Sequence, residues 1–292
     1  MMSTRNTGCL SNKEQFLTLI VERLGKCPID FTEKMRFVQS TSKTEESHLA
    51  AGVLLLLHFR SNDKSPTDNG GGEFFFQLIK RSSRVTQPGD LSCPGGLLHN
   101  YLDPLLRFLV TSGLVPVLRG RALKYVYMRG IDTSRMITLF LTNAMREAWE
   151  ETGLKPWNIL FQGPLPTYSL LLFKRTIFPL VCFVRKEWHF YPNSEVESIV
   201  EIPLKTFFNE RNYGLYNVET SDQSKTNRDV PREFPCLIVR DNQGNEEILW
   251  GATFYIIMNF LNIVLDFKMP DHRAKRIIRR TLGPEYIKGY QE

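Results

Sequence analysis

The stretch that decides the fold is Arg146-Glu147-Ala148-Trp149-Glu150-Glu151-Thr152-Gly153-Leu154. It places glutamates at positions i, i+3 and i+4, so on a helix all three carboxylates project from one face. Like charges stacked in this way repel one another, and a bound divalent cation such as Mg²⁺ or Mn²⁺ is the simplest agent that neutralises the repulsion. A solvated acidic face is the ordinary alternative for such a cluster.

The surroundings of this stretch favour a site over a solvated face. A helix is predicted over about 134–152, and it carries apolar side chains that can dock on a core: Leu141, Met145, Ala148 and Trp149. Gly153 can adopt a left-handed conformation at the helix end, and Pro156 prevents the helix from resuming. Upstream, Gly95 and Gly96 follow a short strand and allow the backbone to come close to another group.

Composition limits the class of protein and of ligand. With 292 residues and 42% apolar side chains, the chain can bury the core of one large domain, with or without additions. The net charge of +6 favours anionic ligands. Basic and aromatic residues do not alternate as they do in a nucleic-acid groove, so no nucleic-acid partner is expected.

The cysteines and the apolar stretches bear on location. Five cysteines, an odd number without a CxxC spacing, indicate a reducing compartment such as the cytoplasm and argue against a disulfide framework or a zinc site. The N-terminus lacks the pattern of a secretion signal. The apolar stretch 248–265 contains Asn259 and Asn262 and is short of the ~20 residues that cross a bilayer. We expect a buried helix there and no membrane span.

The order of elements predicts a mixed sheet flanked by helices. A capping box at Ser11 and Glu14 begins an N-terminal helix that ends at Gly25. A polar link follows at 40–48. Helices are also expected near 203–210 and over 250–265. Strands are expected at 51–59, 73–80, 91–94, 159–165, 176–184, 197–202 and 236–240. The first two form a hairpin around a loop at 61–72, a second loop covers 219–233, and a turn covers 241–244.

The stretch 146–154 resembles the second half of the Nudix box, Gly-x5-Glu-x7-Arg-Glu-U-x-Glu-Glu-x-Gly-U, in which U is aliphatic. The box would begin at Gly96. That glycine lies 14 positions before the arginine in the family pattern and 50 positions before Arg146 here (146 − 96), so about 36 residues are inserted. The early glutamate of the box has no counterpart, because position 102 is Leu102 and the nearest acid is Asp103.

Three further stretches resemble the coenzyme A diphosphatase type of Nudix hydrolase. They are residues 80–90 running into Pro94-Gly95-Gly96, residues 193–197 followed by 202–204, and residues 248–253. The resemblance covers about 50–265. It implies an α/β/α sandwich with a mixed sheet, to which this chain adds an inserted segment and an N-terminal helix. The implied organisation is an N-terminal helix and link (1–48), a Nudix domain (49–266, insertion 97–132) and a basic C-terminal tail (267–292).

The resemblance also implies a function, the metal-dependent hydrolysis of the diphosphate bond of a nucleoside diphosphate derivative. Coenzyme A or an acyl derivative is the leading substrate, and ADP-ribose or a nucleotide sugar is the alternative. A Nudix-fold binding module without turnover is a third reading. By match to the box, Glu147 and Glu151 are ligands of Mg²⁺ or Mn²⁺, and Glu150 is a third ligand or a base. The Gly96 carbonyl completes the metal shell.

The remaining candidate residues surround this cluster. Arg146 orients it through an ion pair with Glu150, four positions along the helix. Arg81 and Arg84 lie just before the glycine turn, where they either grip phosphate or form an exposed strand end. Gln87 is a further candidate for substrate binding. Glu195 is either an extra ligand or base, or an ordinary loop acid.

The insertion carries apolar residues at helical spacing, Leu105, Leu106, Leu109 and Val110. It forms either a lid over the substrate or a contact in a homodimer. Its basic residues are candidates for receiving a 3′-phosphate such as that of coenzyme A. Trp250 is interpreted as a core residue, with a base-stacking role as the alternative.

Overall fold

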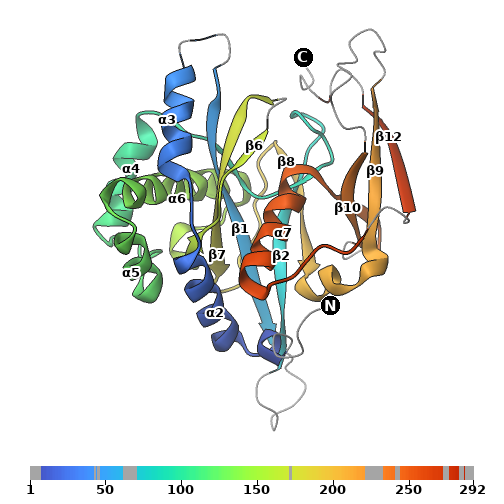
Figure 1. The fold of residues 1–292 in the computed structure, drawn as a ribbon, viewed down its shortest axis with the longest axis horizontal. Helices are drawn as coiled ribbons and strands as arrows, with labels where there is room; N and C mark the ends of the chain where they lie inside the picture. Colours follow the sequence, from blue (N-terminus) through green and yellow to red (C-terminus); the bar gives the residue numbers. More distant parts are fainter. Residues whose placement is uncertain are drawn as a thin grey trace.

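The fold contains two β-sheets, and the smaller one lies to one side of the larger (Figure 1). The structure is a computed structural model that describes residues 8–42, 44, 47–61, 71–170, 173–220, 233–240, 244–271, 276–282 and 286. Most of the two predicted loops at 61–72 and 219–233, and most of the predicted turn at 241–244, lie outside these residues.

The larger sheet has the strand order β3 (Leu91–Ser92), β2 (Gly72–Arg81), β1 (Leu49–Ser61), β7 (Arg175–Val184) and β5 (Ile159–Pro164). Three more strands join it: β4 (Gly95–Leu97) on β1, β6 (Tyr168–Leu170) on β7, and β8 (Val196–Pro203) on β2. β1 and β7 are parallel, whereas β1 and β2 are antiparallel, with Leu56 opposite Gln77. The predicted mixed sheet and the predicted pairing of its first two strands are confirmed.

β1 is buried on both faces, which explains its continuous apolar sequence. Val53, Leu55 and Leu57 belong to one hydrophobic core, and Leu54 and Leu56 belong to another. The first core also receives side chains from α2 (Lys13–Lys26) and α7 (Gly251–Leu265). The second core receives α3 (Phe31–Thr41), α4 (Leu102–Thr111), α5 (Gly120–Met128) and α6 (Ile131–Thr152). Helices therefore cover both faces, as the predicted α/β/α sandwich requires.

A second, four-stranded sheet was not predicted as a unit. Its order is β11 (Glu246–Leu249), β10 (Glu233–Arg240), β9 (Tyr213–Thr220) and β12 (Arg276–Leu282). Only β10 corresponds to a predicted strand. β12 lies in the segment predicted to be a tail and pairs in parallel with β9, beside which it lies in Figure 1.

Other boundaries differ in detail. Asn12 caps α2, because its side chain accepts a hydrogen bond from the Gln15 N–H at 3.1 Å, while the predicted cap Ser11 belongs to a preceding 3₁₀ turn. The helix predicted near 203–210 is a 3₁₀ helix, Leu204–Phe208. α3 was not predicted. The predicted buried helix at 250–265 is α7, and none of the helices described is long and apolar enough to cross a membrane.

Candidate metal and diphosphate site

The candidate site forms where the end of α6 faces β4. Gly153 ends the helix in the left-handed conformation predicted for it, with φ of 74°, and its N–H donates to the Trp149 carbonyl at 2.8 Å. β4 lies antiparallel to β1, with Gly96 opposite Gly52. Glu147 approaches Gly96 and Glu151 approaches Gly95, whereas Glu150 is exposed.

Those glycines permit a close approach that no other residue would. A Cβ atom on Gly96 would lie 2.5 Å from Cδ of Glu147. Gly95 has φ of 145°, and a Cβ atom there would lie 2.2 Å from the Gly52 carbonyl oxygen. The predicted close approach at the glycine pair is confirmed, and the Glu147 carboxylate fills the space that the missing side chain leaves.

Glu151 is the most deeply buried of the three glutamates, with 5% of its surface exposed. Its Oε2 accepts a hydrogen bond from the Gly95 N–H at 2.9 Å. Burial raises the pKa of Glu151 to about 8. The Gly95 hydrogen bond and the charge of Arg81 oppose this rise in pKa, whereas the charge of Glu147 adds to it. The protein therefore holds a carboxyl group where its ionised form is unstable without a cation.

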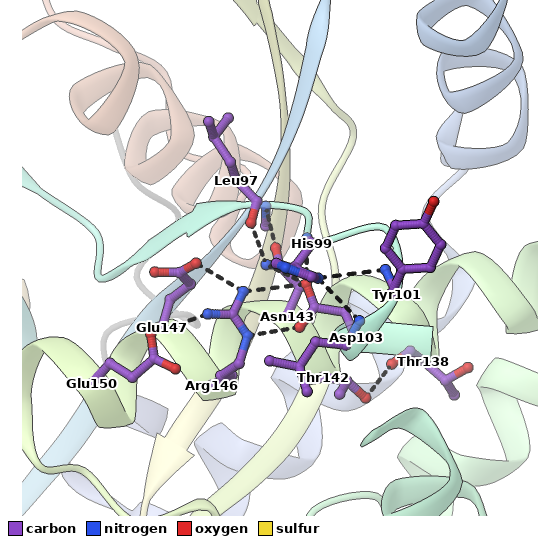
Figure 2. A network of polar contacts seen from close by, with 12 residues as sticks. Leu97, His99, Tyr101, Asp103, Thr138, Thr142, Asn143, Arg146, Glu147 and Glu150 are labelled. Carbon is purple, nitrogen blue, oxygen red and sulfur yellow. Dashed lines mark hydrogen bonds and ion pairs between the residues drawn. The ribbon is translucent and has the colours of Figure 1, made fainter. Parts of the chain in front are cut away.

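Arg146 joins the acids of the cluster (Figure 2). Its Nη1 lies 3.1 Å from Glu150 Oε2, so the predicted ion pair is present, and its Nη2 lies 2.9 Å from Glu147 Oε1. Its Nε donates to Asp103 Oδ1 at 2.8 Å. Burial alone would lower the pKa of Arg146, but the hydrogen bond that Arg146 donates to Asp103 and the charges of the three acids raise it. Arg146 therefore stays charged and holds two of the glutamates.

Asp103 is a site residue whose role the sequence did not reveal. It begins α4 in the insertion and is fully buried. Besides Arg146, it receives hydrogen bonds from the His99 N–H at 2.7 Å and from Asn143 Nδ2 at 3.0 Å (Figure 2). The box lacks its early glutamate at position 102, and the next residue supplies a carboxylate to Arg146.

Asn143 was also missed. Its side chain accepts a hydrogen bond from the Gly52 N–H at 2.9 Å and donates to the Leu97 carbonyl at 2.9 Å. It is fully buried within the apolar part of α6. An amide inside an apolar helical run is the one sequence signal that could have identified it, because a buried amide requires partners. Asn143 ties α6 to β1 and to the end of β4.

Only some of the candidate phosphate-binding residues lie near the glutamates. The charges of Arg81 and Glu195 both act on Glu151, so these two side chains lie near the cluster, although Glu195 is exposed. Arg84 is exposed at the surface. Gln87 has a left-handed backbone, φ of 58°, and its N–H donates to the Tyr286 carbonyl at 2.9 Å. No contact in the described part of the chain joins Arg84 or Gln87 to the glutamates.

A second arginine that interacts with Arg81, Arg175, was not predicted to belong to the site. Arg175 begins β7, and burial followed by the charge of Arg81 lowers its pKa. An anion beside Arg175 would be stabilised, because burial and the charge of Arg81 both disfavour the charged form of Arg175.

The residues present fit a divalent cation in their chemistry. All the candidate donors are oxygens, which Mg²⁺ and Mn²⁺ prefer. Glu147 and Glu151 approach adjacent glycines. Burial raises the pKa of both carboxyl groups, and the charge of Glu147 adds to the rise at Glu151. In the described residues, however, no three acidic, histidine or cysteine side chains are already arranged as a metal site, and Arg146 forms ion pairs with Glu147 and Glu150.

Comparisons with known proteins give a likeness in shape only. No protein-family model matches the chain, and no curated protein matches its sequence. Among solved structures, a Nudix hydrolase from M. smegmatis, RenU, is 14% identical over 53% of this chain and 71% of its own, with a TM-score of 0.30. An Ap4A hydrolase from C. elegans is 12% identical over 54% and 81%, with a TM-score of 0.30. A MutT protein from Methanosarcina mazei Go1 is 15% identical over 57% and 84%, with a TM-score of 0.32.

Proposed function

We propose that this chain is a Nudix hydrolase that uses Mg²⁺ or Mn²⁺ to hydrolyse the diphosphate bond of a nucleoside diphosphate derivative. The observation that carries the proposal is the meeting of Glu147 and Glu151 with the Gly95–Gly96 backbone. Two acids on one helix face approach one backbone turn, and the more deeply buried one has a strongly raised pKa. Such a pair is costly to keep unless a cation neutralises it.

Each residue of the cluster has a role in this proposal. Glu147 and Glu151, with the Gly96 carbonyl, would hold the cation, which supplies charge neutralisation of the diphosphate and lowers the pKa of a bound water. Glu150 either binds the cation or orients the attacking water. Arg146 holds Glu147 and Glu150 in position through its ion pairs. Asp103 in turn orients Arg146.

The substrate's phosphates would lie beside the cluster, between the acids and the basic side chains. Arg81 and Arg175 support this, because the charge of Arg81 acts on the pKa of both Arg175 and Glu151. Guanidinium groups bind phosphate oxygens in a bidentate manner. Coenzyme A or acyl-coenzyme A is the substrate proposed first, on the strength of the sequence resemblance at 80–96, 193–204 and 248–253.

A panel of diphosphates tests the proposal. Coenzyme A, an acyl-coenzyme A, ADP-ribose and a nucleotide sugar would each be incubated with the full chain, with and without Mg²⁺ or Mn²⁺. Release of 4′-phosphopantetheine would identify coenzyme A as substrate, and release from another compound would identify a different one. If none of the compounds is hydrolysed but at least one still binds, the chain is a binding module instead.

Two matched variants connect turnover to the cluster. Glu151→Gln removes the charge of the buried acid and is expected to abolish turnover while folding stays near normal. Glu14→Gln makes the same change at an exposed acid in the first turn of α2 and is expected to leave the rate unchanged. Full activity of the Glu151→Gln variant would refute the assigned role of Glu151.

A further inference from the structure

The chain returns, near its end, to the loop that follows β2. β12 lies beside β9, and Tyr286 after it is buried, with 4% of its surface exposed. Both Tyr286 and Arg280 of β12 contact loop 82–90, which separates β2 from β3. Nearly 200 residues therefore separate the loop from the segment that covers it.

Asp90 is the centre of this contact. Its mostly buried carboxylate accepts hydrogen bonds from the hydroxyl of Tyr286, from Trp250 Nε1 at 3.3 Å and from Arg280 Nη1 at 3.3 Å. Burial raises the pKa of Asp90, and these three donors oppose the rise. A buried carboxylate with three donors is a strong and specific anchor, since removing one donor leaves it undercompensated.

The same two residues also hold the loop backbone. The Gln87 N–H donates to the Tyr286 carbonyl at 2.9 Å, and Arg280 Nη2 donates to the Pro88 carbonyl at 3.0 Å. Gln87 has a left-handed conformation, which a residue with a side chain adopts only at a cost. The contacts from the C-terminal segment stabilise this costly conformation.

The loop in turn fixes the direction of Arg81. Arg81 Nε donates to the Thr86 carbonyl at 2.8 Å, and its backbone N–H donates to the Asp90 carbonyl at 3.0 Å. Thr86 directly precedes Gln87. A shift of the loop would therefore turn the Arg81 guanidinium away from its present position near Glu151.

We infer that the C-terminal segment, through Tyr286 and Arg280, positions loop 82–90 and thereby the phosphate-binding Arg81. The inference rests on the proposed function for the part that Arg81 plays. Tyr286, Arg280 and Asp90 are positioning residues, because they act on the substrate only through Arg81. The segment predicted from sequence to be a basic tail is then part of the substrate site.

Tyr286→Phe tests the inference, since it removes the hydroxyl from Asp90 and keeps the ring. The loss of one charge-assisted hydrogen bond is expected to raise KM for the diphosphate substrate about tenfold, with kcat changed by less than about twofold. Amide hydrogens of residues 81–90 are expected to exchange faster. Tyr255→Phe is the matched control, because Tyr255 on α7 stacks on Tyr168 and no contact in the described part of the chain joins it to residues 81–90, so both readouts should stay unchanged.

A binding measurement separates this inference from the proposed function. Inorganic pyrophosphate would be titrated into the full chain and into each variant by calorimetry. If the wild type shows no turnover but Tyr286→Phe binds pyrophosphate about tenfold more weakly, the inference stands and the hydrolase proposal fails. Equal affinity of the two proteins, or unchanged exchange at residues 81–90, would overturn the inference whatever the turnover.

A double-mutant cycle with Asp90→Asn gives a second route. If Tyr286 acts through Asp90, Tyr286→Phe in the Asp90→Asn background should weaken pyrophosphate binding by less than about twofold further. If the two substitutions weaken pyrophosphate binding independently, so that their fold-changes multiply in the double variant, Tyr286 does not act through Asp90 and the inference is contradicted.

Discussion

At the scale of single residues, Gly96 lies directly against the Glu147 carboxylate, which a side chain at position 96 would displace. A Cβ atom there would lie 2.5 Å from Glu147 Cδ, at the free end of a flexible side chain. We expect Gly96→Ala to change the free energy of unfolding by less than about 1 kcal/mol, because the Glu147 carboxylate can move aside. If Glu147 binds the cation as proposed, the moved carboxylate would misplace that cation, and the rate of diphosphate hydrolysis should fall about 100-fold.

Gly71→Ala provides the comparison for this variant, because a Cβ atom at Gly71 would meet nothing within 4 Å. Both the rate and the thermal unfolding temperature of that control should match those of the wild type. A fully active Gly96→Ala protein would mean that Glu147 does not act from its position over Gly96.

Glu151 makes the free energy of unfolding depend on pH. Its pKa is about 8 in the folded chain and near 4.5 when unfolded, so the folded state binds the proton more tightly. The stability that the protonated carboxyl allows is fully present below pH 4.5 and is lost as the pH rises through 8. Glu151→Gln removes this loss, so the variant should gain about 2–4 kcal/mol over the wild type between pH 4.5 and 8 in metal-free buffer.

Urea unfolding of both proteins at several pH values would measure this difference. Added Mg²⁺ should cancel the advantage at pH 8, since a bound cation stabilises the ionised wild-type carboxylate alone. A constant difference between the proteins across this pH range would show that Glu151 is not desolvated.

At the scale of elements, Asp103 couples the insertion to the acidic helix. It joins α4 to α6 through Arg146 and Asn143, and it is fully buried. Asp103→Asn removes the buried partner of Arg146, whose charge is then compensated only by the more exposed Glu147 and Glu150. We expect this change to lower the free energy of unfolding by about 3 kcal/mol in urea titrations.

The same change at Asp132, an exposed acid in the first turn of α6, should cost only about 0.5 kcal/mol. Equal effects at both positions would mean that the buried ion pair contributes nothing specific. The activity of the Asp103→Asn variant should also fall, because Arg146 would no longer be held from both sides.

The elements that could be predicted are those with a strong local pattern. β1, β2 and α7 are continuous apolar runs, and α6 ends in an acidic cluster followed by glycine. β12 was missed because its arginines mask the alternation of an edge strand, and α3 because its apolar stripe is short. The contacts of Asp103 and Asp90 could not be predicted, since their partners lie 43 and up to 196 positions away.

At the scale of the whole molecule, the N-terminal helix is part of the main core. Leu24 of α2 is fully buried and belongs to the core that also includes α7. A Cβ atom on Gly163 of β5 would lie 2.4 Å from Leu24 Cβ, so the helix lies directly on the strand. Arg129 Nη2, from the end of α5, donates to the Leu24 and Gly25 carbonyls at 2.7 and 2.9 Å.

One packing unit therefore extends from α2 through the insertion to the large sheet, and it should unfold as one. Leu24→Ala is expected to cost about 3 kcal/mol and to move a single calorimetric transition to lower temperature without splitting it. Leu105→Ala, at a leucine that is 72% exposed on α4, should stay within about 0.5 kcal/mol of the wild type. A helix that shares a core with α7 cannot melt while that core stays intact, so a single transition is expected. A second transition at lower temperature in the Leu24→Ala protein would instead show that α2 unfolds separately from the sheet.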